Sequence, residues 1–316
     1  MLDRSEIGKR GYLNEPYRLF HLRDDRALAL DYHYHEFDKL VLLLGGRVTY
    51  HIEGKRYPLQ PMDILLVSRN LIHLPAVESG PVYERMVLWI DREFMSRFST
   101  PEAELSGCFS LTARRGIHLY RPRGEERSRW RTLFEDAEAA VRDEGFASRL
   151  LADTCVLQLL VALNRAVRAA PEEADPASYR FDPKMEEVTR YILAHLGEEL
   201  SIDRLAGAFF LSRYYLMHRF KEVYGCSVHQ YIRQKRLQKA AEAIRRDIPV
   251  LKAAEDAGFG DYSVFLRAFR AAYGKSPREW KRHKKSAETP QRLPIRLAFA
   301  LFLSSSCTTV CNNGSL

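Results

Sequence analysis

The apolar residues of the chain follow two different periods, and the change of period divides the sequence. Between residues 32 and 89, apolar runs of five to seven residues cover positions 40–44, 48–52, 63–67 and 83–89. Turn residues at 45–46, 53–54, 58–61 and 79–81 separate these runs. Several short strands at close spacing are typical of an antiparallel barrel or sandwich.

Helical periodicity replaces this pattern over residues 125–144 and 147–170. The second stretch carries apolar residues at helical spacing, namely Leu150, Val156, Leu157, Leu160, Val161 and Leu163. Two helices with this much leucine must bury it against the barrel, against a second subunit, or against both.

Residues 171–178 contain two prolines and three acids in eight positions, which is typical of an interdomain linker. Beyond it, Asp182 followed by Pro183 predicts a helix start, because proline at the first helical position loses no hydrogen bond. Gly197 is the expected C-terminal cap of this helix, and Ser201 the expected N-cap of the next.

The hundred residues that follow Asp182 contain an internal repeat with an offset of 49 positions. The offset aligns Phe220 with Phe269, Lys221 with Arg270, Tyr224 with Tyr273, Gly225 with Gly274, Ser227 with Ser276 and Tyr231 with Trp280. A unit used twice in so short a stretch indicates a target that itself repeats. Duplex DNA, with a major groove at every turn, is such a target.

Each copy of the repeat predicts an amphipathic helix, over about 212–222 and 261–271, with Ser212 and Asp261 as N-caps. The expected inward faces are Tyr215, Leu216 and Phe220 in the first copy and Val264, Phe265 and Phe269 in the second. The outward faces are then Tyr214, Met217, His218 and Lys221, and Ser263, Leu266, Arg267 and Arg270. A connecting helix over 228–246, about 28 Å long, separates the two units. Both helices are therefore expected to enter successive major grooves, roughly 34 Å apart, without dimerisation.

Charge separates the two parts of the chain as clearly as period does. Residues 182–285 carry 21 Lys and Arg against 13 Asp and Glu, whereas residues 1–181 carry 26 against 27. A basic region beside a neutral one favours a polyanionic partner for the former. Five cysteines without CxxC spacing predict neither a disulfide framework nor a zinc site. The chain starts without an apolar run of signal-peptide length and residues 295–303 are too short to span a bilayer, so we expect a cytoplasmic protein without a membrane partner.

The stretch AGFGDYSVFLRAFRAAYGKSPREWKR and its first copy give residues 182–282 a close resemblance to the DNA-binding domain of AraC/XylS bacterial transcription regulators. The resemblance implies that base edges are read by Tyr214, Met217, His218, Tyr262, Ser263, Leu266 and Arg267. It assigns phosphate contacts to Ser212, Arg213, Lys221 and Arg270. His218 departs from the family, in which arginine is common at that position, and histidine lacks the bidentate fork that reads guanine.

The strand-rich half contains His33 and His35, and later His73, in the outline of a cupin metal site. Lys39 stands where a metal-ligating glutamate is expected, and its charge opposes a bound cation. We therefore expect no metal and no other cofactor, and expect these histidines to line a ligand pocket with Tyr50. Residues 19–89, with YHIEGKRYPLQPMDILLV, resemble the cupin-like sensor domain of the same family. That resemblance implies a small-molecule effector in the barrel and dimerisation through residues 125–170.

The sequence thus predicts a multi-domain protein: an all-β cupin-like barrel at 1–100, a helical dimerisation segment at 101–170, a linker at 171–181, an all-α double helix-turn-helix domain at 182–285 and a disordered tail at 286–316. We expect a non-enzymatic, homodimeric, effector-controlled transcription regulator that binds double-stranded DNA. The resemblance implies activation and contact with RNA polymerase. Two other hypotheses stay open: a metal-dependent cupin enzyme with an accessory nucleic-acid module, and an architectural DNA binder without an effector.

Overall fold

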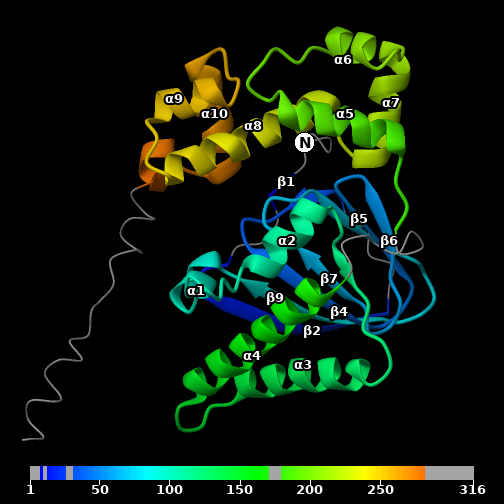
Figure 1. Cartoon of the computed structure of the whole chain (residues 1–316), viewed down its shortest axis with the longest axis vertical. Coiled ribbons are helices and arrows are strands. Elements are labelled where there is room, and N and C mark those ends of the chain that lie inside the picture. The colour runs from blue at the N-terminus through cyan, green and yellow to red at the C-terminus, as the bar shows by residue number, and fades with distance from the viewer. Residues whose placement is uncertain (1–7, 10–12, 26–30, 171–178, 282–316) are drawn as a thin grey trace, which may run out of the picture.

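A computed structural model describes residues 8–9, 13–25, 31–170 and 179–281 of the chain. It contains a β-rich body flanked by helices, and an all-helical region that lies on one end of that body (Figure 1). The multi-domain architecture expected from the change of period, a β barrel followed by a helical region, is therefore confirmed. Of the linker expected at 171–181, residues 171–178 lie outside the described residues, and Arg180 forms a bridge with Arg56 of β6. The tail expected at 286–316 also lies outside the described residues.

Two five-stranded sheets make up the β-rich body. One has the order β1 (Gly8–Lys9), β3 (His33–Tyr34), β8 (His73–Val77), β5 (Val48–Ile52), β6 (Lys55–Pro58). The other has the order β10 (Leu119–Tyr120), β7 (Ile64–Val67), β4 (Asp38–Gly45), β9 (Tyr83–Ile90), β2 (Tyr17–Asp24). The four apolar runs of the sequence form β4, β5, β7 and β9, as predicted. Pairing is antiparallel except between β1 and β3.

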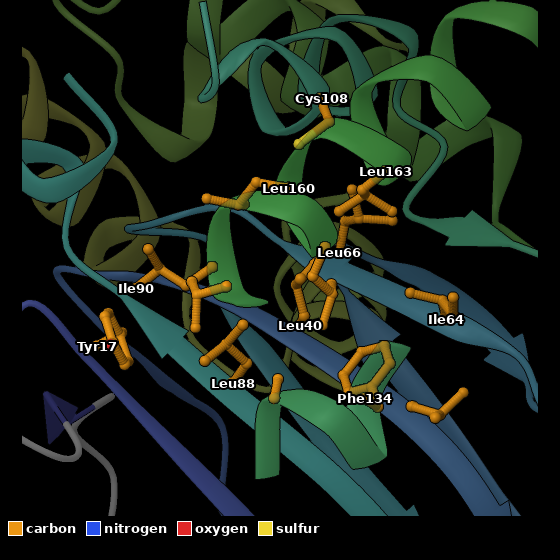
Figure 2. Packing of buried hydrophobic residues seen from close by; sticks show 14 of the residues in the cluster. Tyr17, Leu40, Ile64, Leu66, Leu88, Ile90, Cys108, Phe134, Leu160 and Leu163 are labelled. Atoms are coloured by element: carbon orange, nitrogen blue, oxygen red, sulfur yellow. The ribbon is translucent and has the colours of Figure 1, made fainter. Parts of the chain in front are cut away.

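Strand β4 shows why its sequence reads as an unbroken apolar run. Val41 and Leu43 point into the cluster between the two sheets, whereas Leu40 and Leu42 point into a second cluster under the helices. Figure 2 shows this second cluster, in which Leu40 lies near Leu66 and Leu88 of the sheet and below Leu160 of a covering helix. Because successive side chains of a strand alternate between faces, a sheet covered on both faces needs apolar residues at every position.

Four helices cover that outer face: α1 (Arg92–Arg97), α2 (Gly107–Arg115), α3 (Glu126–Arg142) and α4 (Ser148–Ala169). Helices α3 and α4 occupy the two stretches with helical periodicity. Val156, Leu160 and Leu163 of α4 are fully buried, while Leu150 and Val161 are exposed on its other side. Among the described helices, α4 is the one long and apolar enough to cross a membrane. It packs against α2 and α3, which accounts for its apolar character.

The helical region has six helices within residues 179–281: α5 (Pro183–Ala194), α6 (Ile202–Ala208), α7 (Arg213–Tyr224), α8 (Val228–Arg245), α9 (Val250–Asp256) and α10 (Tyr262–Tyr273). Asp182 caps α5 by accepting from the backbone N–H groups of residues 184 and 185. Helix α5 ends at Ala194 with His195 as its C-cap, so the cap expected at Gly197 was wrong. Ser201 caps α6, as predicted.

The strands and helices that the sequence analysis did not predict include β2, β6, β8, α1 and α2. Strand β2 pairs along its whole length with β9 and closes one edge of its sheet. Strand β8 lies inside the other sheet although it contains Pro75. A proline inside a run reduces the strand signal, because its nitrogen donates no hydrogen bond.

Candidate nucleic-acid interface and ligand pocket

The first helix-turn-helix unit consists of α6 and α7. The hydroxyl of Ser212 accepts a hydrogen bond from the backbone N–H of Tyr215 at 3.1 Å and so caps α7. Gly225 ends α7 with φ of 72°, a left-handed conformation that glycine adopts without steric cost. Leu216 and Phe220 are fully buried and fix the inner face of the helix.

The outer face of α7 carries the residues assigned to base reading. Tyr214 is 74% exposed and Met217 45% exposed. The rings of Tyr214 and His218 stack with centroids 5.7 Å apart and an interplanar angle of 11°. Tyr215, expected on the inner face, is 45% exposed, so this expectation was wrong. Val223 and Tyr224 complete the inner face instead, because the packing surface lies toward the C-terminal end of α7.

The second unit, α9 and α10, repeats this geometry. The carboxylate of Asp261 accepts from the backbone N–H of Val264 at 2.8 Å, and Gly274 ends α10 with φ of 71°. Phe265 and Phe269 are fully buried. The predicted inward position of Val264 was wrong, because 45% of this residue is exposed.

The remaining candidates on α10 differ in exposure. Ser263, Arg267 and Arg270 are exposed to solvent. Tyr262 is 37% exposed, and its ring lies against that of Phe265 with centroids 6.0 Å apart. Leu266, expected on the outer face, is half-buried against the core of the second unit. The outer face of α10 is therefore more polar than that of α7.

The four predicted phosphate contacts lie on or beside the two helices. Arg213 pairs with Asp203 at 3.1 Å, but both side chains are about two-thirds exposed, so the pair is weak and can exchange for a phosphate. Lys221 and Arg270 are exposed and form no ion pair within residues 179–281. The Ser212 hydroxyl accepts the capping bond, which leaves its hydrogen available to a phosphate oxygen.

An aromatic residue that the sequence reasoning did not single out lies in the turn of the first unit. Phe210 is 97% exposed and has φ of 56°. A non-glycine residue in the left-handed region is strained, and such residues cluster at functional sites. No sequence signal marks this position, since phenylalanine there reads as a core residue.

Helix α8 joins the two units, which lie at its opposite ends (Figure 1). Its start is fixed by a capping box between Ser227 and Gln230. The same reciprocal bonds join Ser276 and Glu279 after the second unit. The repeat therefore includes the hydrogen bonds that fix the start of the helix after each unit.

The three histidines of the barrel converge, as their sequence outline suggested. Ligand nitrogens of His33, His35 and His73 lie within 4.8 Å of one another, and all three residues are buried. Nδ1 of His73 donates to the carbonyl of Leu71 at 2.9 Å, which leaves its Nε2 as an acceptor. Burial, followed by the charge of Lys39, lowers the pKa of His73 well below 6.5, so this imidazole is neutral.

Tyr50, the fourth predicted pocket residue, belongs to the apolar cluster between the sheets. Its hydroxyl lies 3.3 Å from that of Tyr83, and the Lys39 ammonium lies 5.7 Å from the centre of its ring. Lys39 thus links Tyr50 to the histidines. Three neighbouring imidazoles fit the nitrogen donors that zinc and other transition metals accept, whereas the buried ammonium beside them opposes a cation.

The barrel meets α8, the helix between the two units, at Glu53, in the turn between β5 and β6. Its carboxylate accepts from the Lys235 ammonium at 2.6 Å, from the Tyr231 hydroxyl at 2.8 Å and from the backbone N–H of Ile72 at 2.8 Å. Lys55 pairs with Glu186 at 3.1 Å on the same side. Sequence reasoning found none of the contacts with Glu186, Tyr231 and Lys235, because these partners lie more than 130 positions away along the chain. Each charged residue alone is typical of a solvated surface.

A β barrel joined to two helix-turn-helix units, each with an exposed helix that carries basic side chains, defines a DNA-binding regulator with a sensor domain. Comparison with known families gives the same result. An AraC-like ligand binding domain matches residues 16–97, and a helix-turn-helix domain matches residues 205–283. The chain belongs to the AraC family of transcription regulators.

Relatives with known names are also transcription regulators. The probable transcriptional regulator LumQ of Photobacterium leiognathi is 27% identical over 257 residues, which are 79% of this chain and 91% of that protein. The transcriptional activator RhaS of Enterobacter sp. strain 638 is 26% identical over 265 residues, 79% of this chain and 87% of that protein. Among solved structures, ToxT of Vibrio cholerae covers 84% of this chain and 98% of its own at 12% identity, with a TM-score of 0.32.

Proposed function

We propose that this regulator binds a small-molecule effector in its barrel and activates transcription in the bacterial cytoplasm by placing α7 and α10 in adjacent major grooves. The observation that carries the proposal is the equivalence of the two units. Each has a capped helix, a left-handed glycine after it and an exposed outer face that contains polar and basic side chains. Such a pair matches the repeat of B-form DNA.

The dimensions of α8 support simultaneous binding by both units. Its 18 residues extend about 27 Å, and the recognition helices lie beyond its two ends. The distance between successive major grooves on one face of DNA is about 34 Å. One chain therefore reads about two turns of the duplex, and bases contacted by α10 include one read by Arg267, whose fork suits guanine.

Activation requires contact with RNA polymerase beside the bound site. The description of RhaS as an activator supports this direction of control. A pull-down of genomic fragments with the purified chain identifies the promoters, and a reporter driven by such a promoter measures the effect. Activation predicts that deletion of the gene lowers reporter output, whereas a rise on deletion would establish repression.

The effector pocket is proposed at His33, His35, Tyr50 and His73. A thermal-shift screen of sugars, amino acids and aromatic acids tests it, because a ligand that binds only the folded state raises the melting temperature. His73→Leu should abolish the shift given by a barrel effector. Stoichiometric metal in the purified protein, lost in the same variant, would instead favour the metal-dependent enzyme.

Homodimerisation is proposed through the outer side of α4. Leu150, Leu157 and Val161 lie at helical spacings of 0, 7 and 11 on this side, and Leu150 is 64% exposed. An apolar line at this spacing is typical of a helix-to-helix seam between subunits. Leu157 is partly buried against the core, whereas Leu150 and Val161 on either side of it are exposed and available to a second copy.

A further inference from the structure

A cavity of about 460 Å³ lies between the β-rich body and the helical region, outside the barrel. Its walls come from the loop after β7, from α1 and α2, and from α8 and the end of α10. This volume is within the range of small-molecule sites. The cavity is separate from the histidine pocket, because it is lined by Arg69, Phe109, Arg245 and Tyr273 and by none of the three histidines.

Positive charge dominates this cavity. Four arginines and one acid line it: Arg69, Arg92, Arg114, Arg245 and Glu242. Arg92 is neutralised by the buried carboxylate of Asp38 at 2.7 Å, and Glu242 pairs with Arg246 outside the cavity at 3.0 Å. Within the described part of the chain, the other three arginines form no ion pair.

Two of these guanidinium groups, those of Arg69 and Arg245, are partly shielded from water and repel each other. Burial, followed by the charges of Arg245 and Arg92, lowers the pKa of Arg69 to about 10. Burial also lowers the pKa of Arg245, although the nearby charges of Glu36 and Glu242 raise it. Like charges in a partly desolvated site destabilise the fold unless a counter-charge joins them.

The cavity also contains hydrogen-bonding atoms without a partner among the described residues. Tyr273 is only 8% exposed, and its hydroxyl has no hydrogen-bond partner there. The same holds for Nε of Arg245, whose guanidinium lies over the ring of Trp280 at 4.9 Å. Buried polar groups are nearly always hydrogen-bonded, so these donors indicate a missing acceptor.

We propose that this cavity binds a small organic anion, whose carboxylate or phosphate group is held by Arg69, Arg245 and the Tyr273 hydroxyl. Guanidinium groups bind carboxylate and phosphate through two parallel hydrogen bonds. Leu71 and Ala113 supply an apolar wall for the organic part of the ligand. This inference deepens the proposed effector control and rests on it, but assigns a second site outside the barrel.

The position of the site gives the anion a regulatory effect. Arg69 belongs to the β-rich body, Arg245 lies at the end of α8, and Tyr273 is the last residue of α10. An anion bound to all three joins the barrel to the second helix-turn-helix unit. The Gln238 side chain already donates to the carbonyl of Asn70 at 2.8 Å across the same boundary. Anion binding therefore fixes the orientation of α10 and changes the affinity for DNA.

The test is a thermal-shift and calorimetric titration of the full chain with benzoate, succinate, citrate and 3-phosphoglycerate at constant ionic strength. Benzoate, succinate and citrate test carboxylates, and 3-phosphoglycerate tests a phosphate. Arg69→Gln and Arg245→Gln should weaken the binding of a positive probe at least about tenfold, because each removes a charge-assisted hydrogen bond. Arg190→Gln, at an exposed arginine of α5 outside the cavity, is the matched control and should bind like the wild type.

Each outcome decides between the two sites. Loss in the Arg69 and Arg245 variants, with full binding in His73→Leu, supports the inference. Loss only in His73→Leu overturns it and leaves the barrel effector in place. If none of the four probes binds, the anion site is overturned as well. Binding of a neutral ligand that is lost in His73→Leu would still support the proposed effector site in the barrel. Without a probe, Arg69→Gln should have a melting temperature no lower than that of the wild type, because it removes a charge that Arg245 and Arg92 repel. This measurement distinguishes lost binding from misfolding.

Discussion

Replacement of Glu53 with glutamine perturbs the contact that joins the barrel to α8, the helix between the two helix-turn-helix units. The Glu53 side chain is 17% exposed and that of Lys235 is 9% exposed, so the pair is largely desolvated. Glutamine keeps the size of the side chain and an oxygen that accepts from Ile72 or Tyr231, but it cannot neutralise Lys235. Removal of one partner from a buried ion pair costs about 3 to 5 kcal/mol, because the other charge stays buried. Since Glu53 keeps some contact with water, we expect about 3 kcal/mol.

Chemical unfolding followed by circular dichroism measures this change. Lys235→Met should cost less than Glu53→Gln, because the carboxylate keeps the Tyr231 hydroxyl and the Ile72 N–H as donors. The double variant should be more stable than the sum of the two single effects predicts, by about 0.5 to 3 kcal/mol. Glu78→Gln is the control, because Glu78 belongs to an exposed pair with Arg47 and should change stability by less than about 1 kcal/mol. Additive effects of the two single variants would show that Glu53 and Lys235 do not meet in solution.

Three further predictions concern DNA binding, pH and assembly. Arg267→Ala should cost about 1 to 3 kcal/mol of DNA-binding free energy and relax the preference at one base pair. Lys221→Ala should weaken binding to all sequences alike and reduce the slope of log K against log salt concentration by about one. Equal effects of both variants on all sequences would refute these roles. Burial lowers the pKa of His118 from 6.5 to about 4, so unfolding takes up a proton as the pH falls below 6.5. As the pH falls from 7 to 5, this residue should therefore lower the free energy of unfolding by about 2 kcal/mol. His118→Leu should remove that part of the pH dependence. An unchanged pH dependence in the variant would contradict the burial of a neutral imidazole. Leu150→Glu on α4 should convert a dimer to a monomer in sedimentation without a loss of helix content, because Leu150 is 64% exposed, and a dimer that persists would exclude this face.

Local signals in the sequence predicted the repeat and its helix boundaries well. Ser201, Ser212 and Asp261 cap their helices because short polar side chains bind the free backbone N–H groups, and this chemistry depends only on neighbours in sequence. Gly225 and Gly274 take left-handed conformations for an equally local reason. These residues fix the elements before any tertiary contact forms.

Features set by tertiary packing were predicted less well. The faces of Tyr215 and Val264 were assigned wrongly, because the side of a helix that is buried depends on where its neighbours pack and not only on spacing. Strand β2 was missed although its sequence YRLFHLRD alternates, since its partner β9 lies some sixty residues away. The cavity around Arg69 and Arg245 has no signal in the sequence, because it exists only where two regions meet.

The central claim is that one chain reads two adjacent major grooves at once. Methylation interference on a selected promoter fragment tests it most directly, because N7 of guanine lies in the major groove. The account predicts two patches of interference on the same face of the duplex, centred about 10 base pairs apart. In Arg267→Ala, interference should disappear from one patch only. A single patch for the wild-type chain, or two patches on opposite faces of the duplex, would contradict the account.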